Sequence, residues 1–251
     1  MNPTGDYLPT LEAWGTSDMG LVRQNNEDYW SIDPALRVAI VADGMGGALC
    51  GEVASSMAVE TVLEYLRSTP LLEPAPTVEA AIKEANRRVL EKARADEGCS
   101  GMGSTFVLAF WALPRLLIAN VGDSRAYLWR DGALTQLSYD QTLVNELRLR
   151  FGLSEEEVRN FPHKNVLTMA VGTTSELTVR THEEDLVPGD VIVLCSDGLT
   201  GPVTDAAIAA TLSRDAPLQY QGEQLITQAK AGGGPDNVTV VLLRYNDWEI
   251  L

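Results

Sequence analysis

Five aspartates lie where apolar stretches of the chain meet turn residues and glycines: Asp28, Asp43, Asp123, Asp197 and Asp236. Asp43 and Asp197 each follow an apolar run and precede a glycine. Carboxylates at the same ends of strands converge at one sheet edge, where they repel each other unless cations neutralise them. Each of these aspartates, taken singly, is also explained as a turn or capping residue. Taken together, they predict a cation site.

The predicted cation is Mg²⁺ or Mn²⁺. The chain contains only two histidines, His163 and His182, so a histidine zinc site is not expected. Carboxylates, a backbone carbonyl and waters form an all-oxygen set that suits these two ions. Two such ions about 3.5–4 Å apart can bridge a water, lower its pKa and present hydroxide to phosphorus.

The charge of the chain narrows the class of protein. Its 19 Lys and Arg residues against 35 Asp and Glu residues give a net charge of −16. Such a chain has no general attraction for nucleic acid or for an anionic membrane. It also repels phosphorylated substrates at long range, so phosphate chemistry would need bound cations at the site.

The chain is long enough for one large domain with a sizeable core, since it has 251 residues of which 45% are hydrophobic. The longest apolar stretch, 105–112, is too short to span a bilayer, and the N-terminus has no signal-peptide pattern. We therefore expect a monomeric cytoplasmic protein.

Three cysteines, Cys50, Cys99 and Cys195, are odd in number and have no CxxC spacing. A disulfide or a zinc site is not expected, in agreement with a reducing cytosol. Cys50 is close to Asp43 in sequence but is expected to be a small buried thiol, and neither Cys50 nor Cys195 is expected to act as a nucleophile.

The elements that must position the aspartates follow from apolar periodicity. A period near 3.6 predicts helices over 53–66, 78–93, 205–212 and about 218–231. Apolar runs between turn residues predict strands over 38–42, 105–112, 115–121, 125–130, 133–137, 191–197 and 238–244. The dipeptide Asp131-Gly132 predicts a tight hairpin, and short strands joined in this way indicate antiparallel sheets.

The sequence predicts one domain with short ends. Residues 1–12 are expected to be a loose arm, 13–246 the domain and 247–251 a short tail. Residues 139–174 have an irregular pattern with two short helical pieces, the second beginning at Ser154. A long mixed insertion of this kind often carries function, although an ordinary connector is the alternative.

Six motifs occur in order along the chain: RQNNED, ADGMGGALCGEVAS, GMGST, ANVGDSRAY, LCSDGLT and GGPDNVTV. Together they resemble the bacterial branch of the metal-dependent Ser/Thr protein phosphatases, the PPM or type 2C family. The resemblance implies an α+β fold in which two antiparallel β-sheets are flanked by helices on both sides, a four-layer α/β/β/α sandwich. It also implies that residues 139–174 form a mobile flap beside the site.

The resemblance assigns the core metal ligands. It implies that Asp43 bridges two core metal ions and that Gly44 gives its carbonyl oxygen to one of them. Asp197 and Asp236 would bind the other ion. The ions would be Mn²⁺ or Mg²⁺.

The resemblance assigns four further residues. Glu27 and Asp28 would hold coordinated waters, and Asp123 together with Asp197 would bind a weaker third ion. Arg23 would grip the substrate phosphate, because a guanidinium can bond two phosphate oxygens at once.

The chain departs from the family pattern at three places. Met45 stands where some members have a histidine that is proposed to protonate the leaving group, so a metal-bound water is the expected acid here. Gln141 and Met169 stand where many bacterial relatives have histidine and arginine. These changes leave the substrate preference open.

The function expected from all of this is hydrolysis of phosphoserine and phosphothreonine in proteins by direct attack of a metal-bridging hydroxide, without a phosphoenzyme. The expected partners are phosphorylated proteins, among them a Ser/Thr kinase or its targets. The alternative is a pseudophosphatase that acts as a phosphoprotein-binding regulatory module. Because degenerate relatives lose ligands and this chain has every expected one, an active enzyme is favoured.

Overall fold

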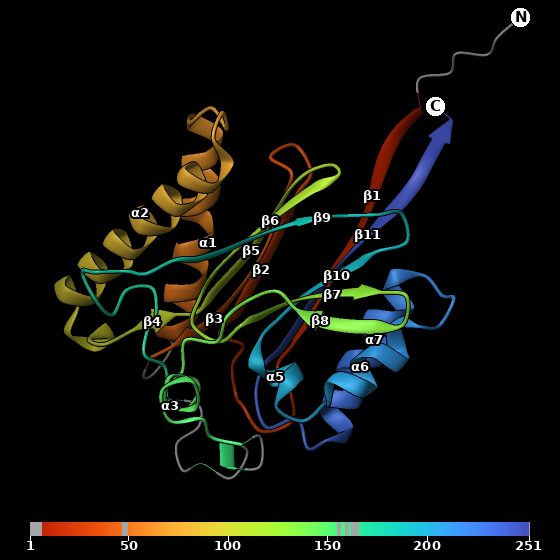
Figure 1. The fold of residues 1–251 in the computed structure, drawn as a ribbon. Helices are drawn as coiled ribbons and strands as arrows, with labels where there is room; N and C mark the ends of the chain where they lie inside the picture. Colours follow the sequence, from red (N-terminus) through yellow and green to blue (C-terminus); the bar gives the residue numbers. More distant parts are fainter. Residues whose placement is uncertain (1–6, 47–49, 155–156, 159–160, 162–165, 251) are drawn as a thin grey trace, which may run out of the picture.

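The structure is a computed structural model that describes residues 7–46, 50–154, 157–158, 161 and 166–250. The described residues form two antiparallel sheets that pack face to face, with helices on both outer faces (Figure 1). Helices α1 and α2 cover one sheet, and α6 and α7 cover the other (Figure 1). The expected α+β sandwich is therefore confirmed.

One sheet has the strand order β1-β11-β10-β7-β8, and the other has the order β2-β3-β5-β6-β9 with β4 paired to β3. The strands of the first sheet are β1 (Tyr7–Asp18), β7 (Arg125–Arg130), β8 (Ala133–Gln136), β10 (Val191–Cys195) and β11 (Val238–Ile250). The strands of the second are β2 (Asp28–Asp33), β3 (Val38–Met45), β4 (Gly103–Ser104), β5 (Phe106–Ala112), β6 (Arg115–Val121) and β9 (Arg180–Asp185).

The described residues contain the four helices that apolar periodicity predicts, together with three others. They are α1 (Cys50–Ser68), α2 (Pro74–Ala95), the 3-10 helix η1 (Glu97–Cys99), α3 (Leu143–Phe151), α5 (Asp197–Thr200), α6 (Asp205–Leu212) and α7 (Leu218–Ala231). Pro74 begins α2, where its missing N–H costs no hydrogen bond. Thr204 caps α6 by accepting from the backbone N–H of Ala207. Among the described residues, no helix is both long and apolar enough to cross a bilayer.

Strand β3 is an unbroken apolar run as far as Ala42, because both of its faces are buried. Val38, Ile40 and Ala42 pack under α1 and α2, whereas Ala39 and Val41 face the other sheet. Alternate residues of a strand point to opposite faces, and here both faces are buried. The apolar run ends at Asp43, where full burial of every residue gives way to a mixed pattern.

Both chain ends differ from the prediction. The loose arm expected over 1–12 is wrong for residues 7–12, which belong to β1, and the tail expected over 247–251 is wrong for residues 247–250, which belong to β11. The two strands pair along their length, from Tyr7 opposite Ile250 to Asp18 opposite Val238. Neither segment has a partner nearby in sequence, so each is a strand only because the other is present. Residues 1–6 and 251 lie outside the described part.

One predicted strand is longer in the structure, and other strands have no counterpart in the prediction. β3 does not stop before the glycine loop but continues to Met45, because Gly44 and Met45 pair with β4. β2 and β9 are not predicted, since the apolar residues of β2 (Tyr29, Trp30 and Ile32) form no continuous run and β9 is mostly charged. β9 reads RTHEED and is an edge strand, where such residues are common. The second helical piece expected from Ser154 falls mostly outside the described residues.

The cysteine prediction is wrong for two of the three residues. Cys50 and Cys99 form a disulfide, with an S–S distance of 2.10 Å. They are 49 positions apart, and the fold brings the start of α1 against the end of η1. Cys195 is free, as expected, and it is also buried, which raises the pKa of its thiol to about 12.

Candidate metal centre

Asp28 and Asp43 face each other across the β2–β3 hairpin. Asp28 is buried, and its Oδ2 accepts hydrogen bonds from Ser196 Oγ at 2.7 Å and from Thr239 Oγ1 at 2.6 Å. Its Oδ1 is buried with no hydrogen-bond partner. Burial raises the pKa of Asp28 to about 7, although both hydroxyl donors act in the opposite direction.

Asp43 is fixed by its backbone, which leaves its carboxylate free to face the cavity. Its N–H donates to Thr105 Oγ1 at 2.9 Å, and its carbonyl oxygen accepts from the Thr105 N–H at 2.8 Å and from Ser104 Oγ at 3.0 Å. Burial raises the pKa of Asp43 well above its ordinary range, and the neighbouring aspartates raise it further. Four neighbouring aspartates raise the pKa of Asp43 through their negative charge: Asp28, Asp197, Asp123 and Asp236.

Asp123 and Asp197 lie just beyond the paired part of strands β7 and β10. The last pair of these strands is Arg125 opposite Cys195. Asp123 and Asp197 each lie two residues beyond this last pair, and both line the cavity. Asp197 also opens helix α5, and its Oδ1 is buried without a hydrogen-bond partner. Burial raises the pKa of Asp123 to about 7, and the charge of Asp197 adds to this effect. Burial and the charge of Asp236 likewise raise the pKa of Asp197.

Asp236 precedes β11 and carries the contact with Arg23. Arg23 Nη2 donates to Asp236 Oδ2 at 2.7 Å, and this hydrogen bond raises the pKa of the guanidinium. The next residue, Asn237, ties this end of the sheet to the β1–β2 loop. Its Nδ2 donates to the carbonyl oxygens of Met19 at 3.0 Å and Asn25 at 2.9 Å.

Glu27 lies in the same loop and is held by its backbone. Its N–H donates to Asn237 Oδ1 at 2.9 Å, and its carbonyl oxygen accepts from the N–H of Gly44 at 3.1 Å and from Ser55 Oγ at 2.6 Å. A side chain on Gly44 would overlap the carbonyl oxygen of Gly51, and a Cβ on Gly51 would come within 2.5 Å of Glu27 Oε2. The close approach of α1 to the loop therefore requires glycine at both positions.

These residues line one cavity of about 460 Å³. Its lining comprises Arg23, Glu27, Asp43, Gly44, Met45, Gly46, Thr105, Asp123, Leu167, Asp197 and Asp236. A larger hollow of about 690 Å³ lies between α1 and α2, but no aspartate lines it. Seven of the eight residues singled out from the sequence thus meet in the first cavity, and Asp28 is buried directly behind Asp43.

Within the described residues, no three acidic, histidine or cysteine side chains already form a closed metal-binding group. Asp236 is paired with Arg23, and the other carboxylates are spread around the cavity wall.

Sequence reasoning missed the residues that support this site. Thr105 holds Asp43, Asn237 holds Glu27, and Ser196 with Thr239 holds Asp28. Ser196, Asn237 and Thr239 are small polar residues next to or close to Asp197 or Asp236, and this adjacency is the signal that could have found them. Thr105 stands in the GMGST motif, which has no aspartate, so no such signal marks it. Their contacts join segments up to 211 positions apart, so only the fold shows which carboxylate each one holds.

A cavity lined by aspartates at one end of a helix-covered double sheet defines a metal-dependent phosphatase fold. The family model of protein phosphatase 2C matches residues 18–227. The chain belongs to this family. It is 37% identical over 243 residues to the serine/threonine phosphatase stp of Listeria innocua, covering 94% of this chain and 96% of that protein.

Solved structures agree with this assignment. The serine/threonine phosphatase PstP/Ppp of Mycobacterium tuberculosis has a TM-score of 0.88 and 34% identity, covering 95% of this chain and all of that chain. The catalytic domain of PstP in complex with two manganese ions has a TM-score of 0.86 and 34% identity, covering 96% of this chain and all of that chain.

Proposed function

We propose that this chain hydrolyses phosphoserine and phosphothreonine in proteins with the help of two Mn²⁺ or Mg²⁺ ions. The observation that carries the proposal is the meeting of Asp43, Asp123, Asp197 and Asp236 in one cavity from four separate parts of the chain. Family membership and relatives that are serine/threonine phosphatases support an enzyme rather than a pseudophosphatase.

The residues present fit divalent cations. Within the described residues, three buried side-chain polar atoms have no hydrogen-bond partner, and two of them are Asp28 Oδ1 and Asp197 Oδ1. A buried carboxylate oxygen without a donor is costly unless a cation or its coordinated water satisfies it. Hard oxygen ligands without histidine or thiolate match Mg²⁺ and Mn²⁺.

The proposed division of the core ligands keeps the roles inferred from the motifs. Asp43 would bridge two ions, and the Gly44 carbonyl oxygen would bind one of them. Asp197 and Asp236 would bind the other. When bound, the ions supply Lewis-acid chemistry, because they activate water for in-line attack and neutralise the charge on the phosphoryl oxygens.

The residues around this core have supporting roles. Glu27 and Asp28 would orient coordinated waters, since Asn25 Nδ2 donates to Glu27 Oε1 at 3.1 Å and two hydroxyls donate to Asp28 Oδ2. Asp123 and Asp197 would form a weaker third site, because both line the cavity, Asp123 from the turn before β7 and Asp197 from the start of α5.

Arg23 is the group proposed to bind the substrate phosphate. Its guanidinium lines the cavity and is half exposed, so it can reach an incoming anion. In this structure it is paired with Asp236. To hold a phosphate, it must turn from that carboxylate to the phosphoryl oxygens, which accept two parallel N–H bonds from it.

We further propose that the protein is a cytoplasmic monomer that acts on phosphorylated proteins, among them a Ser/Thr kinase or the targets of one. The net charge of −16 supports protein rather than nucleic-acid partners. Disulfides are rare in a reducing cytosol, so the Cys50–Cys99 bond makes the placement the first point to test. Cell fractionation and size-exclusion chromatography test the placement and the monomer.

The test of the function is phosphate release from a phosphothreonine peptide as Mn²⁺ is titrated into chelator-treated protein. We expect turnover that rises with Mn²⁺ and disappears again with chelator. Isothermal titration of the same protein with Mn²⁺ alone gives a second readout. Peptide binding without Mn²⁺-dependent turnover would establish the pseudophosphatase instead.

A further inference from the structure

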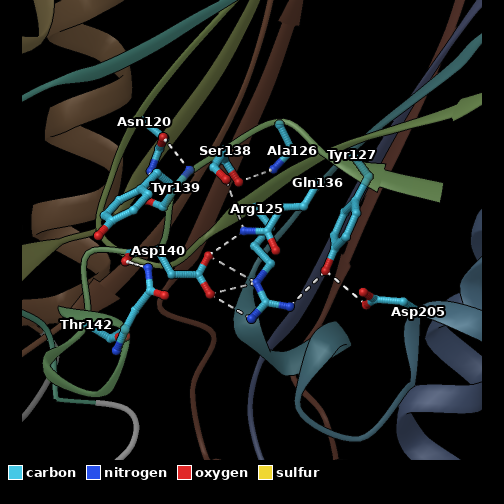
Figure 2. Close-up of polar contacts among 11 residues, drawn as sticks. Asn120, Arg125, Ala126, Tyr127, Gln136, Ser138, Tyr139, Asp140, Thr142 and Asp205 are labelled. Carbon is cyan, nitrogen blue, oxygen red and sulfur yellow. Dashed lines mark hydrogen bonds and ion pairs between the residues drawn. The ribbon is translucent and has the colours of Figure 1, made fainter. Parts of the chain in front are cut away.

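The guanidinium of Arg125 holds the carboxylate of Asp140 at two points (Figure 2). Nε lies 3.1 Å from Oδ1 and 3.0 Å from Oδ2 of Asp140, and Nη2 lies 2.7 Å from Oδ2. The two side chains are only 27% and 16% exposed. A two-point pair shielded from water is stronger and more directional than an exposed ion pair. This contact therefore fixes the position of Asp140 beside β7.

The remaining amino group of Arg125 points away from Asp140 (Figure 2). Nη1 donates to the hydroxyl of Tyr127 at 2.8 Å, and that hydroxyl donates to Asp205 Oδ1 at 3.2 Å at the start of α6. Tyr127 is fully buried in the core. Because its other side is held in this way, Arg125 is a rigid anchor for Asp140.

Asp140 and Gln141 begin the segment 139–174, here called the flap segment. The Asp140 carbonyl oxygen accepts from Asn145 Nδ2 at 2.8 Å in the first turn of α3. Gln141 is buried and pairs with Gly122 at both ends: its N–H donates to the Gly122 carbonyl at 2.9 Å, and its Oε1 accepts from the Gly122 N–H at 2.8 Å. Asp123 therefore lies between two residues, Gly122 and Arg125, that both hold the flap segment.

The same contacts position a residue of the cavity wall. The carbonyl oxygen of Gln141 accepts from the Thr168 N–H at 2.8 Å, and Thr142 forms a β-bridge with Leu167. Leu167 lines the cavity together with Asp123. A chain of direct contacts thus leads from Arg125 through the start of the flap segment to the cavity.

We propose that Arg125 is a positioning residue of the phosphatase, which through Asp140 sets the place of the flap segment and of Leu167 beside the aspartate cavity. The inference rests on the proposed function for its substrate, a phosphoprotein. Leu167 is a flap-segment residue that lines the cavity, so it is placed to touch residues flanking the phosphorylated side chain. Loosening the flap segment weakens the hold on a phosphoprotein more than the hold on a small phosphate ester.

The variants that test this are Arg125→Lys and Asp140→Asn. Lysine keeps the charge but cannot form the two-point contact, and asparagine keeps the shape but removes the charge. The matched control is Arg130→Lys. Arg130 lies at the other end of β7 and holds Asp190 in the same two-point manner, with contacts of 2.8 and 2.7 Å.

The first readout is hydrogen exchange in chelator-treated protein, which needs no activity. The backbone N–H groups of Leu143 and Thr168 donate to Val166 and Gln141 within the flap segment. We expect both to exchange about tenfold faster in Arg125→Lys and Asp140→Asn, equivalent to about 1.4 kcal/mol of lost local stability. They should exchange at the wild-type rate in Arg130→Lys. A purely structural ion pair would lower the melting temperature without this local effect.

The second readout compares two substrates in the Mn²⁺-loaded enzyme. KM for a phosphothreonine peptide should rise about tenfold in Arg125→Lys and Asp140→Asn, whereas KM for p-nitrophenyl phosphate should change less than about twofold. The double variant should be no worse than either single variant, because both remove the same contact.

Wild-type exchange at Leu143 and Thr168 in the Asp140→Asn protein would overturn the proposal, and so would additive effects in the double variant. Equal rises in KM for the two substrates would also overturn it, since they would show that the metal centre itself had changed. If the wild-type protein has no phosphatase activity, the proposed function fails, and the exchange rates alone then decide whether Arg125 holds the flap segment.

Discussion

Asp28 and Asp43 occupy opposite positions on adjacent strands, the first on β2 and the second on β3. The Asp28 side chain is buried, and Asp43 lines the cavity, where burial raises the pKa of its carboxyl. Two buried carboxylates so placed cannot both ionise without cost unless a cation or a proton is present. The relationship makes the stability of the metal-free protein depend on pH in a predictable direction.

We expect the melting temperature of chelator-treated protein to fall as pH rises from 5 to 7. Burial raises the pKa of Asp28 to about 7, well above its value in an unfolded chain. The folded chain therefore keeps a proton that the unfolded chain has lost, and stability falls by up to about 1.4 kcal/mol per pH unit for each such group. Acidic residues with a lowered pKa, such as Glu84 at about 2, titrate below this window.

The control for this pH dependence is Asp28→Asn, which removes the titration and keeps the shape. We expect a shallower slope between pH 5 and 7 in thermal unfolding, and a flat profile for the wild-type protein in Mn²⁺. Identical slopes for wild type and variant in chelator would show that Asp28 does not carry the effect.

We expect Asp236→Asn to abolish phosphatase activity while leaving the fold intact. Asp236 is partly exposed and its side-chain contacts are with Arg23 and its own neighbour Asn237, so the loss of charge has little structural cost. The affinity of the Asp236→Asn protein for Mn²⁺, measured by isothermal titration, should fall at least about tenfold. Loss of a residue that only supports a metal ligand already has an effect of this size. Asp131→Asn, in the β7–β8 turn, should behave as wild type.

We expect Arg23→Ala mainly to raise KM, because a grip on phosphate acts in the ground state as well as in the transition state. Loss of charge-assisted hydrogen bonds predicts a rise of about tenfold to hundredfold. KM of Arg23→Lys should lie between the values for the wild type and for Arg23→Ala, since lysine keeps the charge without the paired donors. Steady-state kinetics on a phosphothreonine peptide would contradict this role if kcat collapsed at unchanged KM.

We expect Gly51→Ala to weaken Mn²⁺ binding and activity together. The added methyl group would come within 2.5 Å of the Glu27 carboxylate and 2.9 Å of the Gly44 carbonyl oxygen, so both must shift. Gly98→Ala is the matched control, because its nearest neighbour would be at 3.4 Å and its backbone is not left-handed. Equal Mn²⁺ titrations for the two variants would show that the close approach of α1 is not needed.

Much of the fold could be predicted from local pattern. Helices α2 and α7 have a clear apolar stripe, and the Asp131-Gly132 turn adopts the positive φ angles, 51° and 85°, that its hairpin requires. β9 could not be predicted, because the charged side chains of an edge strand carry no apolar period. The Cys50–Cys99 bond could not be predicted either, because nothing local brings two residues 49 positions apart into contact.

The sequence by itself determined the chemistry available to this protein: many carboxylates, few histidines, and an ordered set of motifs typical of one phosphatase family. The tertiary structure alone decided which carboxylates meet, because strand register places Asp28 opposite Asp43 and the packing of the two sheets brings Asp123 and Asp197 to one cavity. It also decided that Arg125 holds Asp140 at the start of the flap segment. Register depends on long-range pairing and on the packing of both sheet faces, which no short stretch of sequence specifies.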